Sequence, residues 1–194
     1  MLESLLVPTG VVALAEIGDK TQLLALILAA RFRKPWPIIA GIIAATLANH
    51  AAAGAVGALV SSYLSDTVLH WILAASFTAT ALWTLVPDKI DDDETRTSKA
   101  HGAFVTTLIA FFLAEIGDKT QVATVMLAAQ YPHLILVIIG TTLGMLAANV
   151  PVVLAGNFAA DKLPLTLIRR LAALSFFVLA AFAVYEAMKV SGWV

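Results

Sequence analysis

The stretch Leu14–Gln22 reads LAEIGDKTQ, and the same nine residues recur without a change at Leu113–Gln121. The two copies stand 99 positions apart, about half of the 194-residue chain. The shared register continues in the short runs Leu28–Ala30 and Leu127–Ala129, which both read Leu-Ala-Ala. A nine-residue identity that occurs once in each half indicates duplication of a sequence unit, so the two halves are predicted to share one structure.

Around these two copies the sequence is strongly apolar. Hydrophobic residues make up 60% of the chain and charged residues 13%, with a mean hydropathy of +0.91, whereas soluble domains carry about 25% charged residues. Lipid is therefore expected to solvate part of the surface. Crossing a hydrocarbon layer of roughly 30 Å takes about 20 helical residues, and six stretches are long enough. They are Leu5–Ala30, Pro37–Val60, Val68–Val86, Ala103–Ala129, Leu134–Phe158 and Leu165–Met188.

The fold class predicted from this pattern is all-α, a polytopic membrane protein with six transmembrane helices in two inverted three-helix repeats. We expect residues 1–87 to form the first repeat, 88–101 a polar cytoplasmic linker, and 102–194 the second repeat. Because each repeat has an odd number of helices, the second repeat would enter the membrane from the opposite side. Many secondary transporters share this plan, with the substrate site between the repeats near the membrane midplane.

Basic residues are concentrated in the turns that follow the first, third and fifth predicted helices. These turns hold nine Lys and Arg residues, whereas the other side of the membrane would hold only Lys189. Cytoplasmic loops carry the excess of Lys and Arg, so both termini are predicted to lie outside the cytoplasm. The nine residues are Arg31, Arg33, Lys34, Lys89, Arg96, Lys99, Lys162, Arg169 and Arg170.

Each copy of the repeated stretch places three ionisable side chains within a predicted helix, near the centre of the bilayer. Six such groups facing lipid would cost on the order of 18 kcal/mol, at roughly 3 kcal/mol each, so they are expected to face the protein interior. Residues three positions apart share a helix face, and inverted symmetry would bring the acids of both copies together. The candidate metal ligands are Glu16, Asp19, Glu115 and Asp118.

Four carboxylates with nearby amide and hydroxyl oxygens form a hard-oxygen site, which suits Ca²⁺, Mg²⁺ and Mn²⁺. With the two lysines of the repeated stretch the charge is −2, which one divalent cation neutralises. Without metal, crowded carboxylates would hold protons, so one site could serve metal and protons in alternation. Gly18 and Gly117 would permit close helix approach or local unwinding. Secondary ligand candidates are Gln22, Gln121, Asn49 and Asn149, and Lys20 and Lys119 are candidates for charge balance or gating.

The same polar residues also have structural interpretations. In each copy the glutamate and the lysine have the i, i+4 spacing of a buried intrahelical ion pair, although that interpretation leaves the aspartates without partners. Asn49 and Asn149 are interpreted first as interhelical hydrogen-bond partners. His50 has Val150 at the corresponding position of the second half, and a packing role is favoured. On an ideal helix, Thr21 lies on a different side from the acids.

The pattern E-x-G-D-K-T, present at Glu16–Thr21 and Glu115–Thr120 in the first helix of each half, resembles that of the Gdt-type Ca²⁺/Mn²⁺:H⁺ antiporters. This family includes bacterial manganese exporters, chloroplast manganese transporters and a Golgi protein linked to a glycosylation disorder. The resemblance covers the whole chain in layout, with six helices, a central polar linker and one motif per half. It implies that the acids of both motifs bind metal and protons. The compact length resembles a bacterial member, which implies manganese efflux across the inner (plasma) membrane.

The function expected is secondary transport, the export of Mn²⁺, or of Ca²⁺, from the cytoplasm in exchange for protons. An exporter of basic amino acids or other small cations and a non-transporting membrane scaffold remain alternatives. The chain has no GxSxG or HExxH motif, so an enzyme is not expected. It has no cysteines, which excludes disulfides and iron–sulfur clusters, and its net charge of −1 does not suggest a nucleic-acid partner. No cofactor is expected, and the partners are the divalent cation, protons and the lipid bilayer.

Overall fold

The computed structural model describes residues 1–86, 102–155 and 165–194. In these ranges all regular secondary structure is helical, as the composition predicts. The predicted linker at 88–101 and the last residues of the predicted span Leu134–Phe158 lie outside the described residues. The helices are α1 (Glu3–Glu16), α2 (Lys20–Phe32), α3 (Pro35–Tyr63), α4 (Asp66–Thr84), α5 (Ala103–Glu115), α6 (Lys119–Gln130), α7 (Leu134–Ala155) and α9 (Leu165–Val190).

Three of the described helices are long and apolar enough to cross a membrane, namely α3, α7 and the segment Thr166–Val190 of α9. The shorter helix α5 is also apolar. Large apolar side chains lie on the surface of the long helices, for example Leu59, Leu154 and Phe182, each at least half exposed. A surface of this kind is unfavourable in water and suits contact with lipid.

The first and fourth predicted spans, Leu5–Ala30 and Ala103–Ala129, are not continuous helices. Each is divided into two helices by a break, at Gly18 in the first half and at Gly117 in the second. These glycines have φ angles of 84° and 76°, which glycine adopts without the steric penalty that other residues pay. Of the two roles considered for these glycines, close helix approach and local unwinding, the structure shows unwinding, and a continuous helix across each span is wrong.

An aspartate starts the helix that follows each break. Asp19 has an extended backbone, and its side chain accepts a hydrogen bond of 2.7 Å from the Lys20 N–H. Asp118 occupies the same position before α6 and accepts a hydrogen bond of 3.4 Å from the Thr120 N–H. Such a cap satisfies a backbone donor, and its negative charge is favoured at a helix N-terminus. The Gly-Asp pair of the repeated stretch therefore ends one helix and begins the next.

The middle helix of each half packs on the broken helices of the other half. α3 contacts α5 and α6, and α7 contacts α1 and α2. A Cβ atom at Gly41 of α3 would lie 2.9 Å from the Phe104 carbonyl oxygen, and one at Gly140 of α7 would lie 2.5 Å from the Leu5 carbonyl oxygen. The two contacts are related by the same 99-residue offset as the repeated stretch. The packing of the halves is therefore repeated, and a larger side chain at either glycine would force the helices apart.

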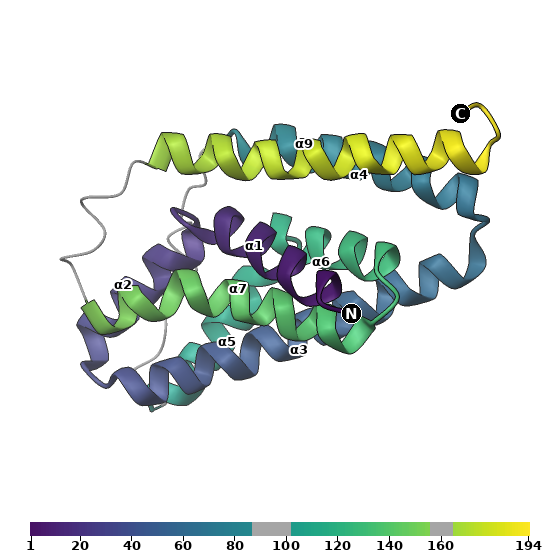
Figure 1. The fold of residues 1–194 in the computed structure, drawn as a ribbon. Helices are drawn as coiled ribbons and strands as arrows, with labels where there is room; N and C mark the ends of the chain where they lie inside the picture. The colour runs from purple at the N-terminus through teal and green to yellow at the C-terminus, as the bar shows by residue number, and fades with distance from the viewer. Residues whose placement is uncertain (87–101, 156–164) are drawn as a thin grey trace.

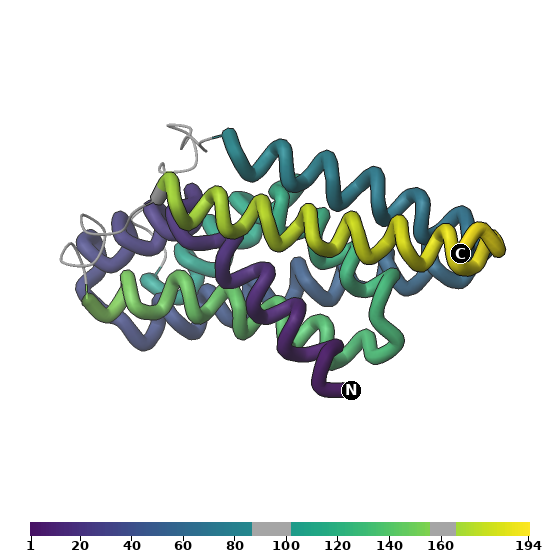
Figure 2. Tube along the Cα trace, turned by 45° about the horizontal axis from the view of Figure 1, so that its top comes forward, coloured from purple at the N-terminus to yellow at the C-terminus, as the bar shows by residue number. Residues whose placement is uncertain are grey.

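Helices α4 and α9 lie side by side and run antiparallel (Figures 1 and 2). The rings of Phe77 and Phe176 stack between them, with centroids 6.5 Å apart. This pair packs on α1 and α6, where Val11, Ala15 and Leu127 belong to the same core cluster as the two phenylalanines. A second core cluster is formed mainly by α2, α3, α5 and α7. Within the broken helices, α1 and α6 pack on the α4–α9 pair, whereas α2 and α5 pack with α3 and α7.

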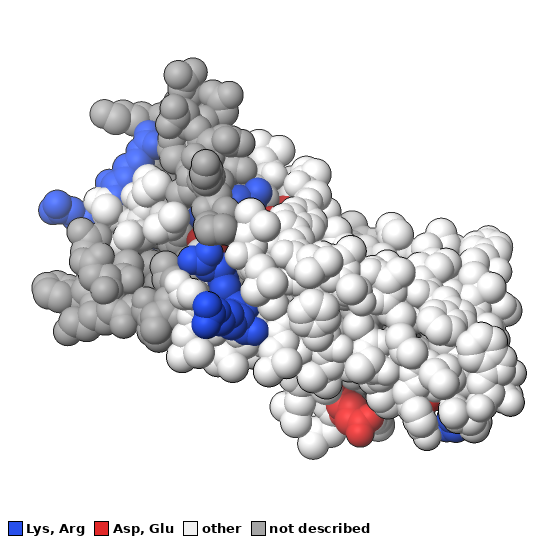
Figure 3. All heavy atoms as spheres, turned by 90° about the horizontal axis from the view of Figure 1, so that it is seen from above, with Lys and Arg blue, Asp and Glu red and all other residues white. Residues whose placement is uncertain are grey.

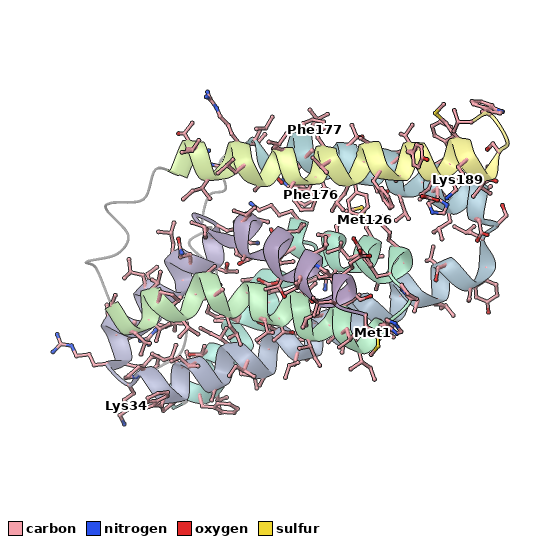
Figure 4. The ribbon with its side chains drawn as sticks, in the orientation of Figure 1. Met1, Lys34, Met126, Phe176, Phe177 and Lys189 are labelled. Atoms are coloured by element: carbon pink, nitrogen blue, oxygen red, sulfur yellow. The ribbon has the colours of Figure 1, made fainter. Side chains whose placement is uncertain are left out.

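Both termini lie at one end of the bundle, and basic residues gather toward the other. Figure 1 shows α1 and α2 running away from the end with the termini, whereas α5 and α6 run toward it. Figure 4 places Met1 and Lys189 at that end and Lys34 at the opposite one, which we call the basic end. On the face that Figure 3 shows, most Lys and Arg atoms also lie toward the basic end.

Candidate metal centre

The two helix breaks bring acidic side chains from both halves to one buried place. Carboxylate oxygens of Glu16, Asp19 and Asp118 lie within 4.8 Å of one another, close enough to share a metal ion. The three residues are 0%, 1% and 4% exposed. Glu16 ends α1, and the aspartates cap α2 and α6. Three of the four predicted ligands therefore form a compact cluster at the breaks, which we call the carboxylate cluster.

The fourth predicted ligand, Glu115, borders the carboxylate cluster. It stands at the end of α5, as Glu16 stands at the end of α1, and it is fully buried. It lies within electrostatic range of Glu16 and of Asp118. Its Oε2 atom accepts a hydrogen bond of 3.4 Å from the Thr120 hydroxyl. Its Oε1 atom has no hydrogen-bond partner among the described residues, so one carboxylate oxygen stays available at this side of the cluster.

The two lysines of the repeated stretch pair across the halves. The Nζ atom of Lys119 lies 3.2 Å from Oδ1 of Asp19, and that of Lys20 lies 4.0 Å from Oδ1 of Asp118. Each lysine thus faces the aspartate of the other copy. These crossed pairs offset part of the buried negative charge. They also give each aspartate an ion-pair partner, whereas a Glu–Lys pair within one helix would leave both aspartates without one.

Each threonine of the repeated stretch faces its glutamate, so the placement expected for Thr21 is wrong. The Thr21 hydroxyl donates a hydrogen bond of 2.6 Å to Oε2 of Glu16, and Thr120 makes the corresponding longer bond in the second half. An ideal-helix projection fails here because it carries one periodicity across Gly18, where the chain changes direction. The hydroxyls hold the carboxylates in place beside the cluster.

Gln22 and Gln121 support the helix breaks. Oε1 of Gln22 accepts a hydrogen bond of 2.9 Å from the Gly18 N–H, and Oε1 of Gln121 accepts one of 2.8 Å from the Gly117 N–H. Nε2 of Gln22 also donates to the Ala148 carbonyl in α7, at 3.0 Å. These amides satisfy backbone groups that unwinding would leave unpaired. As secondary ligand candidates, they are therefore placed at the breaks with their oxygens already engaged by backbone donors.

The two asparagines have different surroundings. Nδ2 of Asn49 donates to the Phe112 carbonyl in α5, at 3.0 Å, which is the type of interhelical bond that the sequence predicts. Nδ2 of Asn149 donates to the Met145 carbonyl at 3.1 Å and to Oε2 of Glu16 at 3.5 Å. Oδ1 of Asn149 has no hydrogen-bond partner in the described ranges. Asn149 faces the carboxylate cluster and is the better of these two ligand candidates.

His50, for which the sequence favours a packing role, lies beside the second glutamate. Its ring is fully buried, and Nε2 is 3.8 Å from Oε2 of Glu115. The available signal was a single ionisable ring in an apolar helix, directly after Asn49. Ionisable residues within a membrane-spanning helix are functional candidates by default. Val150 is not the counterpart of His50 in the structure, because the 99-residue offset of the repeat pairs His50 with Asn149.

The centre offers more oxygen acceptors than the described residues satisfy. Oε1 of Glu16, Oε1 of Glu115 and Oδ1 of Asn149 are buried without a hydrogen-bond partner in the described part of the chain. Buried polar atoms normally pair with protein, water or an ion. Carboxylate and amide oxygens are the donors that hard divalent cations prefer. The arrangement can therefore bind a divalent cation, and in its absence the same oxygens can hold protons.

Charged residues at the breaks of discontinuous helices are typical of membrane transporters, and here they lie in a helical bundle with three helices long and apolar enough to cross a membrane among the described residues. Unwound backbone at membrane depth is tolerated where protein buries it or where it lines a cavity. Comparison with known families identifies the group within this class. The family described as "Divalent cation/proton antiporter GDT1" matches residues 4–92 and again residues 103–191. The chain belongs to this family, which confirms the resemblance carried by the repeated motif.

Curated relatives support the same assignment. A protein of Vibrio cholerae serotype O1 named "Putative manganese exporter" is 59% identical over 170 residues, which are 87% of this chain and 84% of the relative. A GDT1-like protein of Synechocystis is 26% identical over 189 residues, covering 87% of this chain and 90% of the relative. No solved structure matches the chain. Family membership supports cation transport by a multi-pass membrane protein, and the two family matches fit the duplicated sequence.

Proposed function

We propose that the protein exports Mn²⁺ from the cytoplasm in exchange for protons, with Ca²⁺ as a second substrate. The observation that carries this proposal is the meeting of Glu16, Asp19 and Asp118 from both halves, buried and within 4.8 Å. Burying several carboxylates together is costly unless a cation or protons neutralise them. The choice of manganese draws on the name of the Vibrio relative, and proton exchange draws on the family description.

The charge of the site explains how one place could serve both cations. The four acids and two lysines of the repeated stretch carry a charge of −2. One divalent cation neutralises this charge, and so do two protons. Because metal binding requires deprotonated ligands, the two kinds of cargo exclude each other. The net charge of the site is therefore similar whether it holds one metal ion or two protons. The protein can then change between its two access states with either cation bound, which is the requirement for exchange.

Alternating access would come from the two halves exchanging conformations. In this proposal the chain crosses the membrane six times, three times in residues 1–87 and three times in 102–194, with 88–101 as a cytoplasmic linker. The opposite directions of α1–α2 and α5–α6 in Figure 1 support an inverted repeat. The matching contacts of Gly41 and Gly140 support it as well.

We place the protein in the inner (plasma) membrane with both termini outside the cytoplasm, because the basic end lies opposite the termini. The chain has no cysteines, so a single introduced cysteine is the one thiol that a maleimide can label. Val194→Cys in intact cells should react with a membrane-impermeant maleimide, whereas Lys34→Cys should react only after the membrane is opened. The reverse pattern would contradict this orientation.

Purified protein in proteoliposomes provides the test of transport. With Mn²⁺ on one side, a pH gradient should drive metal against the flow of protons, and the flux should grow with the gradient and reverse with it. Apparent metal affinity should fall as pH falls, because protons compete for the same carboxylates.

Two outcomes would change the proposal. Flux that is indifferent to the size and direction of the gradient would contradict exchange and favour a channel. Transport of lysine in place of Mn²⁺, measured in the same vesicles, would favour an exporter of basic amino acids. Liposomes with Glu16→Gln protein serve as the control for leak.

A further inference from the structure

His50 on α3 stands 99 positions before Asn149 on α7, which is the offset of the repeat, and the two side chains face the glutamates of opposite halves. The ring on α3 is fully buried, and neither ring nitrogen has a hydrogen-bond partner among the described residues. Nε2 faces Glu115, 3.8 Å from Oε2. Thr46, one turn earlier on α3, is also buried with no partner for its hydroxyl in the described ranges. Two polar side chains of α3 are thus buried without a hydrogen-bond partner among the described residues, and one of them, His50, faces Glu115.

Packing alone does not account for this arrangement. At the 99-residue offset of the repeat, Asn149 stands where His50 stands, and its amide donates a hydrogen bond to Glu16. The imidazole of His50 makes no such bond to Glu115, and burying two unsatisfied nitrogens is costly. A separation of 3.8 Å is also too long for a direct hydrogen bond. A third group that bridges the imidazole and the carboxylate would satisfy both.

We propose that His50 is a nitrogen ligand of the transported cation, acting with Glu115 at the α3 side of the carboxylate cluster. This inference rests on the proposed function. Two ligand atoms that each lie about 2.1 Å from a metal can be up to about 4.2 Å apart. One ion can therefore contact Nε2 of His50 and Oε2 of Glu115 at their observed separation of 3.8 Å.

A nitrogen ligand changes which cations the site prefers. Ca²⁺ and Mg²⁺ bind through oxygen ligands, whereas imidazole also suits first-row transition metals. The substrate class that follows is divalent transition metals, with Mn²⁺ preferred to Ca²⁺ and Mg²⁺. Glu16 is faced by the amide of Asn149 instead, so its surroundings retain oxygen ligands alone. One histidine makes the two sides of the centre chemically unequal.

The test uses the purified protein, labelled with ¹⁵N-histidine, with Mn²⁺ as the magnetic probe and Ca²⁺ as the comparison cation. Pulsed electron paramagnetic resonance detects magnetic coupling between Mn²⁺ and a directly bound nitrogen. The wild-type protein should show this coupling. The His50→Gln protein should lose it and bind Mn²⁺ about 10-fold or more weakly, while its Ca²⁺ affinity changes little because the amide offers an oxygen.

The matched control is His70→Gln. Nδ1 of His70 lies 2.7 Å from the Asp66 carbonyl oxygen on α4, away from the centre, so coupling and the Mn²⁺/Ca²⁺ preference should stay as in the wild type. A His50→Asn protein, which copies Asn149 at the 99-residue offset of the repeat, repeats the test in case the glutamine variant does not fold.

Each result separates this inference from the function on which it rests. Mn²⁺ bound by the wild type without nitrogen coupling would overturn the role of His50 and leave cation transport intact. His50 variants that keep both the coupling and the Mn²⁺ preference would do the same. A wild-type protein that neither binds nor transports Mn²⁺ would overturn the proposed function and this inference together.

Discussion

The two copies of LAEIGDKTQ have the same sequence but different neighbours. Both break a helix at glycine, cap the next helix with aspartate and turn a lysine toward the other copy. Glu16, however, is faced by Asn149, whereas Glu115 is faced by His50. The duplicated residues build the same backbone twice, and residues outside the copies decide what each acid contacts.

The crossed ion pairs differ as well. The side chain of Lys119 is 2% exposed and lies 3.2 Å from Asp19, whereas that of Lys20 is 17% exposed and lies 4.0 Å from Asp118. The pair at Asp19 is therefore the more enclosed of the two. Substitutions made in parallel in the two halves can show which features are truly shared.

The largest effect is expected at the glutamates. Glu16→Gln and Glu115→Gln should each lower Mn²⁺ flux in proteoliposomes by about 100-fold or more, because each removes a negative charge and a metal ligand at a buried site. The two losses should be similar, since both acids act on one cation although their neighbours differ.

Glu186→Gln is the control for this pair. Glu186 lies 3.8 Å from Lys189 near the end of α9, and its loss should leave flux unchanged. Near-normal flux with either Glu16→Gln or Glu115→Gln would exclude that residue as a ligand.

The lysines should differ in their effect on stability. Lys119→Met removes the 3.2 Å partner of a buried carboxylate at Asp19, and loss of one member of a buried pair costs about 3–5 kcal/mol. Lys20→Met should cost less, about 1 kcal/mol, because its pair is longer and the lysine is partly solvated. Free energies of unfolding in detergent would measure both. Equal losses would mean that the difference in burial has no energetic consequence.

Much of the fold could be predicted from local sequence. The apolar stretches predicted the long helices, and the identity of the two copies predicted that acids from both halves would meet, as Glu16, Asp19 and Asp118 do. The glycines at positions 18 and 117 also carried the possibility of local unwinding, because only glycine adopts a positive φ at little cost.

The rest depended on contacts that periodicity does not encode. Thr21 was placed wrongly because a helical projection assumes one axis, whereas α1 and α2 have separate axes on either side of the break. The crossed pairs of Lys20 and Lys119, and the approach of His50 to Glu115, join segments far apart in the chain. A repeat predicts which residues correspond, but it does not predict which helix packs against each one.

The glutamines should show a smaller difference between the halves. Gln22→Leu removes hydrogen bonds to the Gly18 N–H and to the Ala148 carbonyl, the second of which ties the break to α7. Gln121→Leu removes the bond to the Gly117 N–H at a more exposed place. Leaving buried groups unsatisfied costs about 1–3 kcal/mol, so Gln22→Leu should destabilise by about 2 kcal/mol and Gln121→Leu by less. Thermal unfolding of both variants in detergent would measure this, and a larger loss for Gln121→Leu would contradict the added bond to α7.

The smallest effect, and the one that should be equal in the two halves, belongs to the glycines of the breaks. A Cβ atom at Gly117 would meet nothing within 4 Å, so Gly117→Ala introduces backbone strain alone, about 1 kcal/mol for a left-handed residue. Gly18→Ala should carry the same strain, because its φ of 84° is close to the 76° of Gly117.

Gly10→Ala is the control, because Gly10 lies inside α1 with open space around it, and alanine there should stabilise the helix. The free energy of unfolding in detergent should therefore fall for Gly117→Ala and rise for Gly10→Ala. If both were stabilising, the glycines would not be what breaks the helices, and the polar side chains around the break would have to impose it.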